Sequence, residues 1–163
     1  MDDKKVLFAT LIAEVKDTIR KPIDHYQKLQ DICDLLKEQV SYYDWVGFYL
    51  VDPQRKKALV LGPFAGEPTE HIRIPFGKGI CGQAAETKAT FLVQDVSKAT
   101  SYLSCSPSVK SEIVIPIFKN GIVIGELDID SHQLSPFTDD DNQFLEDICA
   151  LIADQLYSLK IGL

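Results

Sequence analysis

A hairpin signal in the second half of the chain constrains the fold most. The runs EIVIPIF and IVIGELDID are rich in β-branched residues, and only Lys119, Asn120 and Gly121 separate them. Asn-Gly between two such runs favours a two-residue type I′ turn, because both residues tolerate positive φ. The sequence therefore predicts two adjacent antiparallel strands in a sheet.

Further strand-like segments precede this hairpin. DWVGFYLVD (44–52) and ALVLGPF (58–64) predict a second antiparallel hairpin, because strand-forming residues flank a polar turn. HIRIP predicts a short strand, followed by a glycine-rich turn and a short helix from about Ile80. TFLVQDV predicts one more strand before a long polar stretch.

Amphipathic helices are predicted at both ends of the chain. Apolar residues at three- and four-residue spacing indicate helices over about 4–19 and 23–39. A third helix is expected over about 138–158, with Thr138 as its N-cap and acidic residues in its first turn. Antiparallel hairpins between terminal helices indicate an α+β domain in which these helices cover one face of the sheet.

Composition and charge exclude several functional classes. The 163 residues carry a net charge of −7, whereas nucleic-acid binding needs clustered Lys and Arg. No apolar run approaches the ~18 residues of a membrane span, and the start MDDKK has acidic residues where a signal peptide would be basic. We therefore expect a cytoplasmic protein with neither nucleic acid nor membrane as a partner.

The four cysteines have no common pattern. They form neither a disulfide framework nor a CxxC zinc motif, and Cys33 and Cys149 accompany helical apolar stripes typical of core positions. Cys81, in GKGICGQ, could have its thiol pKa lowered by a helix N-terminus, although simple packing is the alternative. Cys105 lies in a polar loop among serines and a proline, so it is either a reactive thiol or an exposed one without a role.

Carboxylates cluster on the last predicted strand. Alternation in GELDID places Glu126, Asp128 and Asp130 on one face, and Glu112 begins the partner strand. Mutual repulsion should raise the pKa of at least one carboxyl on this face, so that it could hold a proton near neutral pH. The alternative is a solvated strand face, since charged residues are mostly exposed.

Two aromatic residues share a face of the first predicted strand. Trp45 and Tyr49 lie on the same side of WVGFY, with Gly47 between them. Core packing is one interpretation. The other is the wall of a small apolar pocket, in which Gly47 leaves room for a ligand.

Six segments together resemble a known enzyme family. WVGFYL, LVLGPFAGEP, RIPFGKGICG, SEIVIPI, GELDIDS and FTDDD are similar to segments of the free methionine-(R)-sulfoxide reductases, which are built on a GAF domain. The resemblance implies one GAF domain over 1–163. It would have N-terminal helices over about 4–40, the sheet and pocket over about 44–131, and the C-terminal helix. In this fold the terminal helices pack on one face of the sheet, and shorter helices and loops form a pocket on the other.

The resemblance also implies roles for two cysteines. Cys105 matches the family's nucleophile, and Cys81 matches the second cysteine. Many members have a further cysteine ten residues before the GICG cysteine, where this chain has His71. The resolving thiol therefore remains open at this position.

The remaining site residues implied by the resemblance bind the substrate. Glu112, Asp128 and Asp130 match the carboxylates that hold the sulfoxide oxygen and the substrate amino group. Trp45 and Tyr49 match the aromatic residues beside the substrate methyl group.

The implied reaction uses cysteine chemistry alone. A thiolate attacks the sulfoxide sulfur of free methionine (R)-sulfoxide while a carboxyl protonates the oxygen, and a sulfenic acid results. A second thiol or an external dithiol such as thioredoxin would resolve it, so no metal, nicotinamide or flavin is expected. The alternatives are a GAF domain that senses a small ligand without turnover, and a module that forms a homodimer through its terminal helices.

Overall fold

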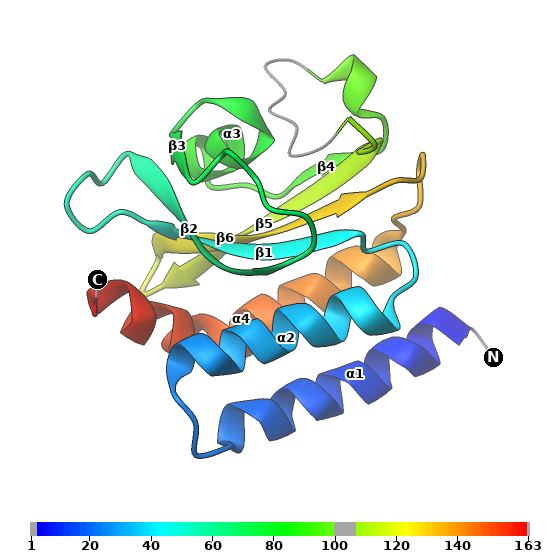
Figure 1. Cartoon of the computed structure of the whole chain (residues 1–163), viewed down its shortest axis with the longest axis horizontal. Helices are drawn as coiled ribbons and strands as arrows, with labels where there is room; N and C mark the ends of the chain where they lie inside the picture. The colour runs from blue at the N-terminus through cyan, green and yellow to red at the C-terminus, as the bar shows by residue number, and fades with distance from the viewer. Residues whose placement is uncertain (1–2, 100–106, 163) are drawn as a thin grey trace.

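The computed structural model describes residues 3–99 and 107–162, and a six-stranded antiparallel sheet runs through its centre. The strand order is β3-β2-β1-β6-β5-β4, so β1 and β6 occupy the middle (Figure 1). The strands are β1 Trp45–Val51, β2 Ala58–Ala65, β3 Arg73–Pro75, β4 Phe91–Val93, β5 Ser111–Lys119 and β6 Ile122–Ser131. Each strand predicted from the sequence is confirmed.

The turn between β5 and β6 has the expected conformation. Lys119 pairs with Ile122, and Asn120 and Gly121 have φ of 52° and 77°. Two consecutive residues at positive φ are the requirement of a type I′ turn. The turn sets the register next to it, and a shift between Ile117 and Phe118 then moves the pairing by one residue, which brings Glu112 opposite Asp130.

Three long helices lie on one side of the sheet. They are α1 Asp3–Arg20, α2 His25–Gln39 and α4 Asp139–Ile161, and a single-turn 3-10 helix, η1 Val96–Lys98, lies elsewhere. The helices α2 and α4 pack on the strands, while α1 forms an outer layer against α2 and α4 (Figure 1). The expectation that the terminal helices cover one face is confirmed. None of these described helices is both long and apolar enough to cross a bilayer.

The two faces of the sheet carry separate apolar cores. The larger core joins the helices to the sheet and includes Leu11, Leu36, Phe48, Leu127 and Ile152. The smaller core lies under α3 Gly79–Thr87, on the opposite face (Figure 1). Cys33 and Cys149 belong to the larger core, as predicted. Strand alternation therefore sends β1 and β6 side chains into two different environments.

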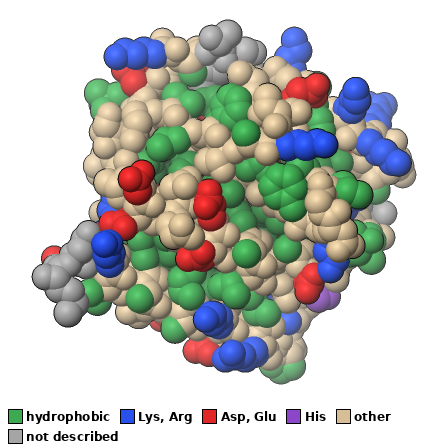
Figure 2. Space-filling view, turned by 180° about the vertical axis from the view of Figure 1, so that it is seen from behind, with side chains coloured by type: hydrophobic (Ala, Val, Ile, Leu, Met, Phe, Trp, Pro, Cys, Tyr) green, Lys and Arg blue, Asp and Glu red, His purple; other side chains and the backbone are tan. Residues whose placement is uncertain are grey.

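Charge is unevenly spread on the face turned away from the viewer in Figure 1. Figure 2 shows apolar and acidic side chains over its centre, with Lys and Arg side chains mostly toward the rim. Phosphate binding needs basic side chains gathered in one patch, because each neutralises one phosphate. This face does not offer such a patch.

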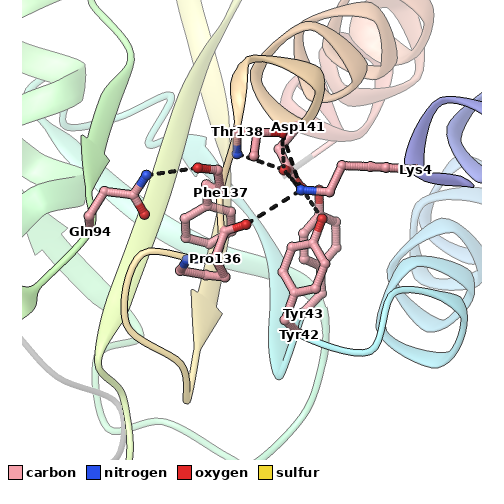
Figure 3. Close-up of polar contacts among 8 residues, drawn as sticks. All are labelled: Lys4, Tyr42, Tyr43, Gln94, Pro136, Phe137, Thr138 and Asp141. Atoms are coloured by element: carbon pink, nitrogen blue, oxygen red, sulfur yellow. Dashed lines mark hydrogen bonds and ion pairs between the residues drawn. The ribbon is translucent and has the colours of Figure 1, made fainter. Parts of the chain in front are cut away.

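A buried carboxylate ties the N-terminus of α4 to the rest of the helical layer. Asp141 is fully buried and accepts hydrogen bonds from Lys4 Nζ at 2.6 Å, Tyr42 Oη at 2.6 Å and Tyr43 Oη at 2.7 Å (Figure 3). Its Oδ2 also accepts the N–H of Thr138, the N-cap residue, at 2.9 Å. One side chain thus connects α1, the segment before β1 and α4.

Replacing Asp141 by alanine is expected to lower the free energy of unfolding by about 3–5 kcal/mol, because one buried donor and two partly buried donors lose their acceptor at once. Denaturant unfolding measures the effect. The matched control is Asp139→Ala in the same helical turn, where an exposed carboxylate contributes at most ~1 kcal/mol through the helix dipole. Equal losses in the two variants would contradict a structural role for Asp141.

Candidate functional site

A small cavity of about 20 Å³ lies between α3 and the face of the sheet opposite the long helices. Its walls come from β1, β5, β6, α3 and the segment before β3. The lining residues are Trp45, Tyr49, Thr69, His71, Ile74, Lys78, Gly79, Ile80, Cys81, Glu112, Asp128 and Asp130. Six of the seven predicted site residues therefore line one cavity. The seventh, Cys105, lies outside the described residues.

Strand register brings three carboxyl groups together. Glu112 of β5 faces Asp130 of β6 across the hairpin, and Asp128 lies on the same face two residues before Asp130. Directly opposed residues on antiparallel strands have their Cβ atoms about 4.5–5.5 Å apart. The three side chains are only 4%, 4% and 3% exposed. The alternative of a solvated strand face is therefore wrong, because α3 and its flanking loop cover this side.

Burial controls the protonation of this group. Desolvation raises the pKa of Glu112 well above its ordinary value, and the charges of Asp128 and Asp130 raise it further. Burial also raises the pKa of Asp128. These directions agree with the predicted rise in pKa on this face, and burial and mutual repulsion favour the protonated form of Glu112. That a carboxyl holds a proton near neutral pH stays a prediction.

Asp128 contributes an acceptor that nothing in the described protein uses. Its side chain lines the cavity and is 4% exposed, yet Oδ1 has no hydrogen-bond partner among the described residues. Buried polar atoms nearly always have a partner, so an exception of this kind needs a reason. A ligand that donates hydrogen bonds or carries positive charge would provide one.

Glu126 is a fourth carboxyl on the same face of β6, outside the cavity lining. It is fully buried between Tyr49 of β1 and Pro116 of β5, and neither carboxyl oxygen has a hydrogen-bond partner among the described residues. Burial, and then the charge of Asp128, raises its pKa well above the ordinary value. Folding therefore favours the protonated form of Glu126.

This proton uptake predicts how stability depends on pH. A group whose pKa is raised by folding stabilises the folded state below the ordinary pKa of 4.5, and that contribution is lost as pH rises. The free energy of unfolding should therefore fall from pH 5 to pH 8. Glu126→Gln should reduce this slope by up to about 1.4 kcal/mol per pH unit, since glutamine does not ionise. Denaturant unfolding across this range measures the slope.

Glu14→Gln is the matched control, because Glu14 is exposed in the middle of α1. Its slope should equal that of the wild type. A Glu126→Gln variant with an unchanged slope would show that Glu126 stays ionised in the folded protein.

Cys81 is the third residue of α3 and points at the carboxyl group of Glu112. Its Sγ lies 3.8 Å from Glu112 Oε2, and the side chain is buried. Burial raises the pKa of this thiol, and the surrounding carboxylates, Asp128 first, raise it further. The expectation that the helix N-terminus lowers this pKa is wrong, because desolvation and negative charge outweigh the helix dipole.

Trp45 and Tyr49 form one wall of the cavity and hold the neighbouring loop. Trp45 Nε1 donates to the carbonyl of Glu67 at 2.9 Å, and Tyr49 Oη donates to the carbonyl of His71 at 3.0 Å. Both side chains also belong to the smaller core. They are therefore core residues and pocket-wall residues at the same time. A Cβ on Gly47 would lie 2.3 Å from Trp45 Cη2, so the indole ring fills the space that the sequence suggested for a ligand.

Several lining residues were not found by sequence reasoning. His71 and Thr69 reach the cavity from the loop before β3, and Lys78 precedes α3 beside them. Their one available signal was proximity to the glycine-rich turn at Gly77 and Gly79, where φ is 85° and 63°. Such angles favour glycine and turn the chain sharply into α3.

A model of the GAF domain family matches residues 24–156. The chain belongs to the GAF domain family. This GAF domain is 38% identical to GAF domain-containing protein A of Dictyostelium discoideum, over 91% of this chain and 92% of that protein. It is 43% identical to a free methionine-R-sulfoxide reductase of Saccharomyces cerevisiae, over 67% of this chain and 61% of that enzyme.

The architecture of this GAF domain also matches a solved enzyme. A structure of free methionine-R-sulfoxide reductase from Neisseria meningitidis, in complex with its substrate, superposes with a TM-score of 0.89 at 34% identity. The match covers 100% of this chain and 96% of the neisserial chain. The predicted GAF-like architecture is confirmed, from the helical layer to the pocket face.

Proposed function

We propose that this GAF domain reduces free methionine (R)-sulfoxide to methionine, with Cys105 as the nucleophile and thioredoxin or a similar dithiol as the reductant. The observation that carries the proposal is the convergence of the six described site residues on one cavity, where burial raises the pKa of Glu112. The yeast reductase and the neisserial substrate complex support the same substrate class. The single domain over 1–163 is part of this proposal.

The cavity suits a small zwitterion with an oxygen that must be protonated. The cavity is small, at about 20 Å³, which favours a free amino acid over a peptide. The unpartnered Oδ1 of Asp128 is an acceptor for a substrate ammonium group. The aromatic wall of Trp45 and Tyr49 provides apolar contact for the methyl end.

The first chemical step needs an acid as well as a thiolate. The Cys105 thiolate attacks the sulfoxide sulfur, and Glu112 gives its proton to the oxygen, which leaves poorly as a bare anion. The protonated oxygen then passes to the Cys105 sulfur while the bonds from the methionine sulfur to that oxygen and to Cys105 break, so methionine departs and Cys105 becomes a sulfenic acid. Burial, and then the negative charge of Asp128 and Asp130, raises the pKa of Glu112 and favours the protonated acid that this step needs.

In this proposal Cys81 resolves the sulfenic acid. Glu112 becomes a carboxylate once its proton has been transferred, and its Oε2 lies 3.8 Å from Cys81 Sγ. It can then accept the thiol proton, and the resulting thiolate displaces hydroxide from the sulfenic sulfur to form a disulfide. His71 occupies the position of the family's further cysteine, so Cys81 or the external dithiol does this work. A dithiol then regenerates both thiols by exchange.

The runner-up function is a small-ligand sensor. A buried pocket alone is compatible with binding without turnover, but a ligand sensor has no need for a protonated carboxyl beside a thiol. A dimerisation module, the third possibility, has no need for the cavity. A homodimer and a cytoplasmic location, where thiols are kept reduced, are both compatible with the reductase.

The test is an assay of both free methionine sulfoxide epimers with excess dithiothreitol, followed by chiral separation of the products. Only the R epimer should be consumed, and a peptide containing methionine sulfoxide should remain unchanged. Binding measured by calorimetry without consumption of either epimer would favour the sensor. Sedimentation analysis of the same sample would establish whether a homodimer forms.

A further inference from the structure

Three potential metal ligands meet in the cavity from three separate elements. The Sγ of Cys81 on α3 and carboxylate oxygens of Glu112 on β5 and Asp128 on β6 all lie within 4.8 Å of one another. All three side chains are buried. The sequence offered no metal signal, because the donors are far apart in the chain and no CxxC pair is present.

Their spacing fits a tetrahedral ion. Zinc binds thiolate sulfur at about 2.3 Å and carboxylate oxygen at about 2.0–2.2 Å, which places the two ligand atoms roughly 3.5 Å apart at a tetrahedral angle. Cys81 Sγ and Glu112 Oε2 are 3.8 Å apart, so a small side-chain adjustment brings them to this geometry. Three protein ligands would leave the fourth position open.

The unpartnered oxygen of Asp128 is an independent indication that a donor or cation belongs here. The side chain is 4% exposed and lines the cavity, and Oδ1 has no partner in the described part of the chain. A thiolate among carboxylates also selects for ion type. Sulfur ligands favour zinc and its chemical relatives over magnesium or calcium, which prefer oxygen ligands alone.

We propose that the substrate-free cavity binds one divalent ion of the zinc class through Cys81, Glu112 and Asp128. Binding forms one metal–sulfur and two metal–oxygen bonds, and the thiol and any protonated carboxyl release their protons to solvent. No electron is transferred. The ion occupies the position proposed for the substrate and ties up the Cys81 thiol, so it acts as a reversible block of the site. The metal site itself does not depend on the reductase activity.

Cobalt(II) is the probe, because thiolate ligation gives it a sulfur-to-metal charge-transfer absorption. The titration uses anaerobic, reduced Cys105→Ser protein, so that Cys105 cannot supply the sulfur. One equivalent of cobalt should bind with this absorption, and Zn²⁺ should displace it. When Cys81→Ser is combined with Cys105→Ser in one protein, the absorption should disappear. When Asp128→Asn is combined with Cys105→Ser, cobalt binding should weaken at least about tenfold, as expected for loss of one ligand.

Cys149→Ser in the same host is the matched control, because Cys149 is a buried thiol in the core on the other side of the sheet. It should keep the absorption, and circular dichroism should verify that each variant is folded. Where Cys81→Ser is unfolded, Cys81→Ala replaces it. Absence of thiolate-ligated cobalt, or an absorption that survives loss of Cys81, would overturn the proposal. The reductase assay with metal-free wild-type protein tests the proposed function separately.

Discussion

Replacement of Cys105 by serine is expected to lower turnover of free methionine sulfoxide by at least about 10³-fold, because an unactivated hydroxyl is a far weaker nucleophile than a thiolate. The reason lies in sequence context and family resemblance, since Cys105 lies outside the described residues. A single-turnover experiment measures the effect most directly. The wild type should convert one equivalent of sulfoxide without added reductant, and the variant should convert none.

Cys149→Ser is the matched control for this experiment. Cys149 is a buried thiol of the larger core, on the far side of the sheet from the cavity. The Cys149→Ser variant should still convert one equivalent of sulfoxide, even if the altered core packing lowers the stability of the protein. Retention of turnover in Cys105→Ser would show that Cys105 is not the nucleophile. Cys81 would then be the next candidate for that role.

The second large effect concerns the buried carboxyl groups. Glu112→Gln is expected to lower kcat by about 10²–10⁴-fold, because the amide keeps the shape but has no acidic proton to give. Asp128→Asn should act mainly through a higher KM, because an amide cannot neutralise a substrate ammonium group as a carboxylate does. Steady-state kinetics with a dithiol reductant separate the two effects.

Glu86→Gln is the control for the carboxyl variants, because Glu86 belongs to α3 but is exposed. Its kinetic constants should equal those of the wild type. The kcat of the Asp130→Asn variant should lie between those of Glu112→Gln and Glu86→Gln, since Asp130 faces Glu112 and raises its pKa. If the kinetic constants of Glu112→Gln, Asp128→Asn and Asp130→Asn all remain within a few-fold of the wild-type values, these three carboxyl groups have only a structural role.

Local chemistry in the sequence was enough to predict the elements and two hairpins. Asn120-Gly121 has a conformational preference that operates over two residues, so the β5–β6 hairpin could be inferred without tertiary contacts. The pairing of Glu112 with Asp130 could not, because it follows a register shift between Ile117 and Phe118. Apolar periodicity likewise predicted the three long helices, and Thr138 was correctly predicted as the N-cap of α4.

Burial of the site was decided by the tertiary structure. Strand alternation shows that Glu126 and Asp128 share a face, but it does not show whether water or protein covers that face. The placement of α3 over the sheet makes it an interior, and this reverses the expected exposure of the carboxyl groups. It also raises the pKa of Cys81, where a helix N-terminus alone would lower it.

The fold class, the two hairpins and six residues that converge on the cavity could be inferred from the sequence, because short-range preferences and family resemblance carry that information. The packing of the layers decided which groups lose contact with water. It also decided that the Trp45 ring fills the space above Gly47 and that Cys81, Glu112 and Asp128 meet at metal-ligand spacing. Desolvation and distance between remote segments depend on how the layers pack, and no local pattern of residues encodes either quantity.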